Sequence, residues 1–169
     1  MAKRRRIDIT AAELSELSGT PAESPSPPVE ATVSDSLITV GVIHSPLTDR
    51  KKAPRQGSEG GAEAWLEVYA DFASGLEGIE AGSRIILITW LHRSRRDVLE
   101  VHPRGEREAP LTGVFATRSP DRPNPLGLHQ VKVLAISGNR LKVAPLEAID
   151  GTPVIDIKPV LTATANREA

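Results

Sequence analysis

The sequence predicts a mainly β protein, a compact β-barrel with one short helix, preceded by a disordered N-terminal leader. Three observations lead to this fold class: seven or eight short apolar runs, a single segment with helical character, and a proline-rich start without aromatic residues. Many short strands without alternating helices favour a small barrel or a strongly bent sheet. The 169 residues, 39% hydrophobic and 25% charged, have the composition of one globular domain.

The first 36 residues differ in composition from the rest of the chain. They are rich in Ala, Glu, Ser, Thr and Pro, and four of the prolines lie between positions 21 and 28. Such a segment buries too little apolar surface to offset the entropy lost on ordering. We therefore predict a disordered leader over residues 1–36, a folded domain over residues 37–163 and a short tail over residues 164–169.

The strands of the folded part follow from its apolar and β-branched runs. The predicted strands are residues 37–44, 64–69, 83–92, 98–101, 111–116, 128–136, 140–147 and 154–157. Between two of them, Gly138-Asn139 is typical of a tight hairpin turn. Residues 71–80 are the helix candidate, although Gly75 and Gly78 lower the helix propensity of this segment.

Composition excludes several classes of protein and site. The absence of Cys excludes disulfides, zinc–thiolate sites and cysteine nucleophiles. The longest apolar run, residues 85–91, is far shorter than the roughly 20 residues of a spanning helix. No apolar region follows the basic start, so no secretory signal is predicted and we expect a cytoplasmic protein. The four histidines lack metal-ligand spacing, and we expect no metal.

The charge distribution shows no strongly basic domain. The formal net charge is −1, with a net charge of −2 in residues 1–36 and +1 in the remainder. A site for a polyanion must therefore be a local patch. No Gly-x-Gly-x-x-Gly fingerprint follows a strand, which disfavours a Rossmann nucleotide fold.

Residues 116–127 form the segment richest in candidate binding groups. Three prolines stiffen it, and it carries Arg118, Asp121, Arg122 and Asn124. A stiff loop loses little entropy when a ligand docks, and guanidinium groups suit carboxylates and phosphates. The alternative is a rigid connection whose Arg and Asp side chains pair with each other; we favour a binding function.

Three other segments are ambiguous when each is taken alone. Residues 51–61 combine basic side chains, Gln56 and glycines, which is also typical of a flexible surface loop. Residues 92–96 form a basic stretch that could bind phosphates or be part of a mixed solvated face. In the third segment, Asp156 and Lys158 lie two residues apart, so they share one strand face and can form a surface ion pair.

Taken together, these segments and their neighbours form an ordered set of motifs. The motifs are Gly41-Val-Ile-His-Ser-Pro46, Pro54-Arg-Gln56, Gly113-Val-Phe-Ala-Thr-Arg-Ser-Pro120, Arg122-Pro-Asn-Pro-Leu-Gly127 and Asp150-Gly-Thr-Pro-Val-Ile-Asp-Ile-Lys-Pro159. They resemble the TsaA-like (TrmO) family of tRNA threonylcarbamoyladenosine methyltransferases. The resemblance covers residues 37–161. It implies a homodimeric β-barrel that uses S-adenosyl-L-methionine (SAM) to methylate the N6 nitrogen of threonylcarbamoyladenosine beside the tRNA anticodon.

The resemblance also implies residue roles. It implies a cofactor site made by Pro54, Arg55, Gln56, His92, Arg93, Arg118, Leu128, Asp150, Gly151, Thr152 and Pro153. Relatives often carry an aromatic residue where this chain has Leu91 and a Tyr where it has Val160. Some relatives continue into a C-terminal domain, which we expect this chain to lack.

Methyl transfer to a urea-like nitrogen should require removal of its proton. Asp150 and Asp156 are the candidates for this role, and Arg122, Asn124 and Lys158 are candidates for contacts with the tRNA. Two other functions stay open: a SAM-dependent methyltransferase acting on another acceptor, and a non-catalytic barrel that binds SAM or RNA.

Overall fold

The computed structural model describes residues 36–161; the predicted tail and all of the predicted leader except Ser36 lie outside this range. Within it, the chain forms eight strands and four short 3₁₀ helices. The strands are β1 (Gly41–His44), β2 (Ala62–Val68), β3 (Arg84–Trp90), β4 (Glu100–Val101), β5 (Thr112–Gly113), β6 (Leu126–Ser137), β7 (Arg140–Leu146) and β8 (Pro153–Pro159). The 3₁₀ helices are η1 (Gly57–Glu59), η2 (Ala70–Leu76), η3 (Pro103–Gly105) and η4 (Val114–Ala116).

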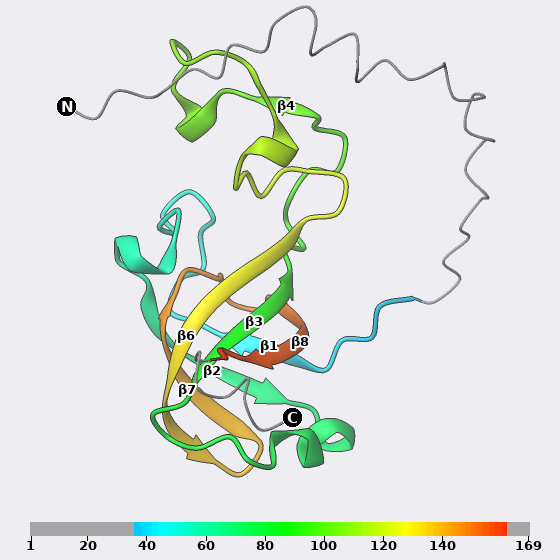
Figure 1. Ribbon diagram of the computed structural model, residues 1–169, viewed down its shortest axis with the longest axis vertical. Helices are drawn as coiled ribbons and strands as arrows, with labels where there is room; N and C mark the ends of the chain where they lie inside the picture. Colours follow the sequence, from blue (N-terminus) through cyan, green and yellow to red (C-terminus); the bar gives the residue numbers. More distant parts are fainter. Residues whose placement is uncertain (1–35, 162–169) are drawn as a thin grey trace, which may run out of the picture. The chain divides into compact units, whose positions relative to one another are not determined.

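Six of these strands close into an antiparallel barrel in the order β1-β2-β7-β6-β3-β8, and β4 and β5 form a separate two-stranded sheet (Figure 1). The predicted mainly β fold class and the predicted barrel are thus confirmed. Closure pairs every barrel strand on both sides and leaves no open sheet edge among these six strands.

The barrel closes around a core because its strands alternate in side-chain direction. On β3, Ile85 and Leu87 are buried while their neighbours face outward, and on β6 Val131 and Val133 are buried in the same way. Each such side chain stabilises the fold by about 1.5–3 kcal/mol on full burial. The fully enclosed members of the core are Ile43, Leu66, Leu87, Val133, Leu141, Val143, Leu146 and Val154.

Local sequence explains where the elements end. The hairpin between β6 and β7 turns at Gly138, whose φ of 60° lies in the left-handed region, so the predicted tight turn is confirmed. The predicted helix over residues 71–80 is shorter than expected, a 3₁₀ helix at Ala70–Leu76. Gly75 lies inside it, and Gly78 follows with a φ of 84°, which no helix can contain.

The strands predicted over residues 98–101 and 111–116 are also shorter than expected. β4 and β5 have two residues each and pair only with each other, and η4 occupies the rest of the second segment. Outside the barrel they lack a second pairing partner and an apolar face to bury, so nothing extends the ladder.

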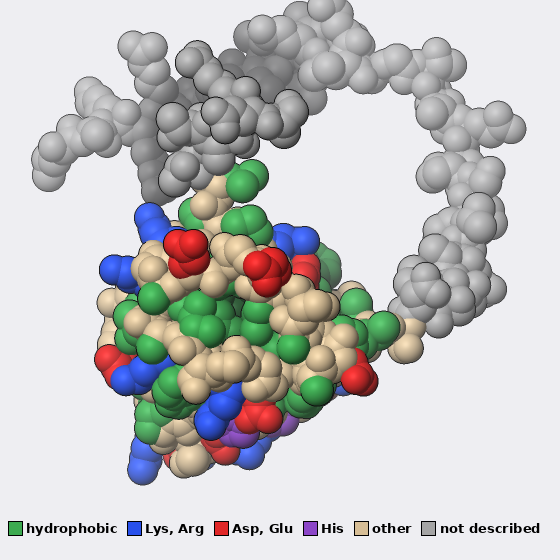
Figure 2. Space-filling view, turned by 90° about the horizontal axis from the view of Figure 1, so that it is seen from below, with side chains coloured by type: hydrophobic (Ala, Val, Ile, Leu, Met, Phe, Trp, Pro, Cys, Tyr) green, Lys and Arg blue, Asp and Glu red, His purple; other side chains and the backbone are tan. Residues whose placement is uncertain are grey.

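Antiparallel order places three long connections at one end of the barrel. These are residues 45–61 after β1, residues 91–125 after β3 and residues 147–152 after β7. We call this end the loop end. The opposite end carries η2 and the β6–β7 turn, and we call it the hairpin end; hydrophobic side chains gather in the middle of that face (Figure 2).

Candidate functional site

The loop end contains most of the residues singled out from the sequence. Those in its three connections, or directly beside them, are Pro54, Arg55, Gln56, His92, Arg93, Arg118, Arg122, Asn124, Asp150, Gly151, Thr152 and Pro153. They come from separate parts of the chain, and the barrel brings their connections to the same end.

A cleft of about 570 Å³ opens at this end, lined by Thr48, Asp49, Arg50, Lys51 and Arg93. Hydrogen bonds that cross between connections shape it. The Arg93 guanidinium donates to the Thr48 carbonyl at 3.2 Å, and the Arg50 guanidinium donates to the Arg93 carbonyl at 3.2 Å. Cofactor pockets commonly have volumes of about 300–1,000 Å³, so the cleft is large enough for a nucleoside-sized ligand.

Asp121 joins the same two connections through its carboxylate. It accepts hydrogen bonds from Arg50 Nη2 at 2.7 Å and from the Arg95 N–H at 2.8 Å, both at Oδ1. Partial burial by itself would raise the pKa of Asp121, but these two hydrogen bonds and the charges of Arg50 and Arg95 outweigh it and lower the pKa. The carboxylate therefore stays ionised and holds both connections.

Arg122 organises the proline-rich segment from within. Its guanidinium donates to the carbonyls of Ser119 at 2.8 Å, Val114 at 3.0 Å and Thr117 at 2.6 Å. These bonds fold residues 114–119 into a compact turn and leave the Arg118 side chain exposed on its surface. Within the described residues, Arg118 forms no ion pair. The sequence made Arg122 a candidate for contacts with the tRNA; in the structure its guanidinium also builds the turn that carries Arg118.

The β7–β8 turn is fastened to the end of β1. Asp150 Oδ1 accepts a hydrogen bond from the Ser45 N–H at 3.0 Å, and the Gly151 N–H donates to the Ile43 carbonyl at 2.8 Å. Gly151 has a φ of 73°, which favours glycine. The buried Thr152 hydroxyl donates to the Ile149 carbonyl at 2.6 Å. This turn therefore presents Asp150 at the loop end with little freedom.

The segment that carries Arg55 and Gln56 also packs closely against the barrel. Gln56 directly precedes η1, and Arg55 donates to the Arg104 carbonyl at 2.6 Å. A Cβ on Gly57 would lie 2.7 Å from the Pro145 carbonyl oxygen, so only glycine permits this approach. The turn therefore lies directly on the end of β7.

His92 lies directly beyond β3, beside Arg93. Partial burial lowers the pKa of its imidazole, and the adjacent Arg93 charge lowers it further. Near neutral pH the ring is uncharged and can both donate and accept a hydrogen bond.

The three remaining predicted site residues lie on the outer wall of the barrel. Ile88 of β3 pairs with Leu128 on one side and with Asp156 on the other, so both residues flank it on the outward face. Leu128 is 54% exposed. Lys158 Nζ lies 2.8 Å from Asp156 Oδ2, which is the surface ion pair that their spacing allowed. The predicted residues thus form two groups, one at the loop end and one on the outer wall.

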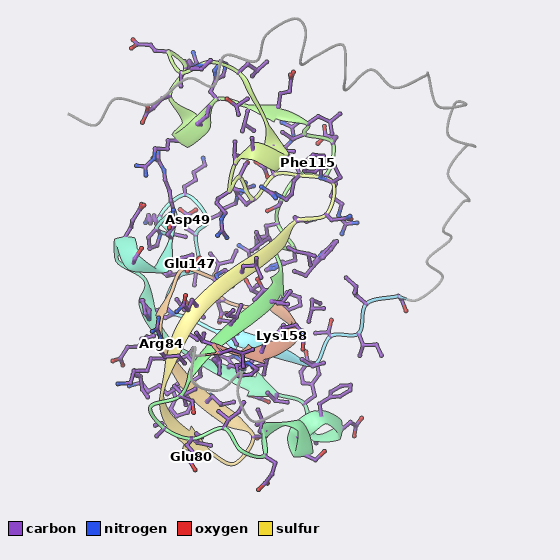
Figure 3. All side chains as sticks on the ribbon, viewed as in Figure 1. Asp49, Glu80, Arg84, Phe115, Glu147 and Lys158 are labelled. Carbon is purple, nitrogen blue, oxygen red and sulfur yellow. The ribbon has the colours of Figure 1, made fainter. Side chains whose placement is uncertain are left out.

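A buried polar chain at the loop end was not predicted from the sequence. His129 is 5% exposed and lies inside the barrel, where its Nδ1 is 2.8 Å from Glu147 Oε1 and its Nε2 is 2.8 Å from the Thr89 hydroxyl. Figure 3 shows Glu147 at the loop end, below Asp49. The alternation of β6 could have identified His129, because it shares the inward face with Val131.

No helix within residues 36–161 has the length and hydrophobicity to cross a membrane. In the same range, no group of three His, Asp or Glu side chains is arranged to hold a metal ion.

Comparisons with known proteins identify the family to which the matched residues belong. Residues 42–165 match the family model described as the tRNA-methyltransferase O N-terminal domain. An S-adenosyl-L-methionine-binding protein from Archaeoglobus fulgidus is 47% identical over 122 residues, which cover 72% of this chain and 86% of the relative. The probable S-adenosyl-L-methionine-binding protein VirR from Rhizobium radiobacter is 45% identical over 124 residues, covering 73% of this chain and 70% of the relative.

A solved structure extends the similarity to the fold. A crystal structure of TrmO from Pseudomonas aeruginosa matches with a TM-score of 0.61 and 30% sequence identity. The match covers 80% of this chain and 59% of the TrmO chain. This chain therefore spans about three fifths of the length of the TrmO protein that it matches.

Proposed function

The chain belongs to the family of the tRNA-methyltransferase O N-terminal domain, and from this premise we propose that it is a SAM-dependent tRNA methyltransferase. Its acceptor is the N6 nitrogen of threonylcarbamoyladenosine beside the anticodon. The observation that carries the proposal is the cleft of about 570 Å³ at the loop end, where the connections after β1 and β3 meet around Arg93. A tRNA-modifying enzyme of this kind acts in the cytoplasm.

The donor set at the loop end fits SAM. A guanidinium pairs with a carboxylate such as that of the methionine moiety, and Arg93 and Arg118 both offer one. The Gln56 amide and the neutral His92 ring supply the donors and acceptors that the edge of an adenine base requires. When bound, SAM supplies a methyl group already activated on a sulfonium.

The chain's own residues then have to orient the acceptor and remove its proton. Orienting the acceptor nitrogen is the larger task. The connections at the loop end are suited to it because hydrogen bonds between them hold their side chains in place before any ligand binds. We assign proton removal to Asp150 in preference to Asp156. Asp150 is exposed at the loop end with Oδ1 held by Ser45, whereas both oxygens of Asp156 are engaged, by the Ile157 N–H and by Lys158.

The tRNA is bound by side chains of the 91–125 connection. Arg118 is exposed on its compact turn, and Asn124 is exposed two residues before β6 begins. Contacts of arginine with phosphates position an RNA without reading its sequence. The threonyl carboxylate of the modified base offers Arg118 a second anionic partner. Lys158, on the outer wall, is the remaining candidate for a phosphate contact.

We also propose a homodimer, which the outer wall supports. Leu126 and Leu128 are exposed there, beside Ile88 and Trp90 on β3, and together they form an apolar strip. Such strips commonly mark protein interfaces. We propose that the two copies pack through this strip so that Leu128 and Asp156 of one protomer lie beside the loop end of the other. Both groups of predicted residues would then belong to one shared site.

Nucleoside mass spectrometry tests the function directly. The purified chain is incubated with SAM and with tRNA that carries threonylcarbamoyladenosine, and the tRNA is then digested. The expected result is one added methyl group on that nucleoside and none on tRNA that lacks the threonylcarbamoyl group.

Other outcomes select the alternatives. No methylation, with SAM still raising the melting temperature, would retain the cofactor site and discard the acceptor. Turnover on another acceptor alone would identify a different SAM-dependent methyltransferase. Binding of SAM or of the modified tRNA without turnover on any acceptor would identify a non-catalytic binding barrel.

A further inference from the structure

The polar chain of Thr89, His129 and Glu147 lies inside a barrel whose other inward side chains are almost all apolar. Thr89 is fully buried and the His129 side chain is 4% exposed, whereas the Glu147 side chain is 18% exposed. A buried polar group is costly unless it is hydrogen-bonded, and here each contact of the chain is 2.8 Å long. These three hydrogen-bonded side chains therefore extend from the core towards the loop end and reach the surface only at Glu147.

The contacts define the direction of the hydrogen bonds. A carboxylate only accepts, so His129 Nδ1 donates to Glu147 Oε1. In the neutral ring, Nε2 then accepts from the Thr89 hydroxyl. Gly127 makes this arrangement possible, because a Cβ at that position would lie 2.5 Å from both His129 Nε2 and Thr89 Oγ1. The hydrogen bonds among Thr89, His129 and Glu147 thus join β3, β6 and the end of β7 in one fixed arrangement.

The outer end of the chain supports the segment that carries Gln56. A Cβ on Gly57 would lie 3.0 Å from Glu147 Oε2, and a Cβ on Gly61 would lie 2.8 Å from the Leu146 nitrogen. The turn that begins at Gly57 therefore rests on the last residues of β7 and on the Glu147 carboxylate. Its own hydrogen bonds run from the Glu59 N–H to the Gln56 carbonyl and from the Gly61 N–H to the Gly57 carbonyl.

We propose that Glu147, held by His129 and Thr89, is a positioning residue that sets the turn after Gln56 and with it the cofactor-binding segment 54–56. This inference rests on the proposed function, since that function assigns SAM to the segment. The Glu147 carboxylate supports this turn through its close approach to the backbone of Gly57. A displacement of about 1 Å at the turn is enough to weaken an oriented site substantially.

The test compares four variants with the wild-type full chain. Glu147→Leu removes the acceptor for His129, whereas Glu147→Gln retains an oxygen that accepts from Nδ1. Val133→Ala is the matched control. Val133 is fully buried and lies on β6, the strand that carries His129, but in the half of β6 nearer the hairpin end. Gly57→Ala disturbs the same support from the turn side and serves if Glu147→Leu does not fold.

Hydrogen exchange of the Glu59 and Gly61 amides is the first readout and needs no cofactor. Glu147→Leu should raise these exchange rates by about tenfold, because the turn opens locally, whereas Val133→Ala should affect them no more than the rest of the barrel. Glu147→Gln should restore wild-type exchange. Unchanged exchange at both amides in Glu147→Leu and Gly57→Ala, or exchange in Glu147→Gln as fast as in Glu147→Leu, would overturn the inference.

The dissociation constant of SAM, measured by calorimetry, is the second readout. Glu147→Leu should weaken binding by about tenfold and Glu147→Gln by less than about threefold. Unaltered SAM binding in a Glu147→Leu protein with faster turn exchange would overturn the link between the turn and the cofactor. A wild-type chain that binds no SAM would instead contradict the proposed function, while the exchange data would still decide whether Glu147 holds the turn.

Discussion

The two ends of the barrel are built by different forces. At the hairpin end β6 and β7 join by a short turn, and Leu141 and Ile136 line a hollow of about 410 Å³ with residues of η2. At the loop end, long connections are held by hydrogen bonds such as those of Arg50 and Arg122 to backbone carbonyls. The difference indicates that burial of apolar side chains stabilises the hairpin end, whereas hydrogen bonds determine the conformation of the connections at the loop end.

A substitution that leaves a cavity at the hairpin end tests this comparison most directly. Leu141 is fully buried, so Leu141→Ala should lower the free energy of unfolding by about 3 kcal/mol. The affinity of the folded protein for SAM should not change, because the loop end is untouched. Urea denaturation and calorimetry measure the two quantities. A loss of SAM affinity in this variant would mean that the two ends are coupled.

The next largest effect concerns the two aspartates. Asp150→Asn should lower kcat by about 100-fold, the lower range for loss of a general base, with little change in stability. Asp156→Asn is the matched control on the outer wall, and its kcat should fall much less. Single-turnover methylation of modified tRNA distinguishes them. The reverse order would transfer proton removal to Asp156 and to a site shared between protomers.

Arg122→Ala should lower the free energy of unfolding by about 2 kcal/mol, because three carbonyls lose a charged donor. It should also weaken activity, since the turn that presents Arg118 would open. Arg107→Ala, an exposed arginine in the same connection, should alter neither property. Equal effects of both variants would show that charge, and not the folded turn, matters at this connection.

Arg118→Lys keeps the charge but removes the planar fork. If Arg118 binds a carboxylate with two hydrogen bonds, this change should raise the Michaelis constant of SAM or of the tRNA by about tenfold. Unchanged Michaelis constants for both ligands, together with full activity, would exclude the two-point contact. Steady-state kinetics with each ligand varied in turn gives the answer.

The smallest expected effect is the pH dependence of Asp121. Because its pKa in the folded state lies below the ordinary value of 3.8, the ionised carboxylate favours the folded protein. This contribution is complete above that ordinary value and is lost as the pH falls through the folded-state pKa. Asp121→Asn should cost about 1 kcal/mol at pH 7 and should flatten the decline of stability in acid, as measured by urea denaturation from pH 7 to pH 3.

Where local chemistry decides the outcome, the sequence predicts the structure correctly. The alternation of residues 128–136 predicts a strand, and Gly138-Asn139 predicts the turn that follows it. Both depend on neighbours in the chain. The helix predicted over residues 71–80 is shorter in the structure because Gly75 and Gly78 oppose it, and the sequence pattern does not show how far they shorten it.

The candidate site also combines features that depend on neighbours in the sequence with features that depend on distant residues. Motifs in the sequence identified the segments around Gln56, Arg118 and Asp150, and the assignment of a cofactor to them stays a prediction. No spacing in the sequence revealed that Arg50 would reach Asp121, which is 71 residues away, or that Glu147 would meet His129 inside the barrel.

By itself, the sequence determined that this is a protein of short β-strands with polar, proline-stiffened connections, because strand alternation and turn chemistry are local properties. Only the tertiary structure decided which connections share an end, which arginines hold backbone and which stay exposed, and that Leu128 and Asp156 face outward. The reason is closure of the barrel: strand order and register bring distant residues together, and both depend on the packing of the whole core.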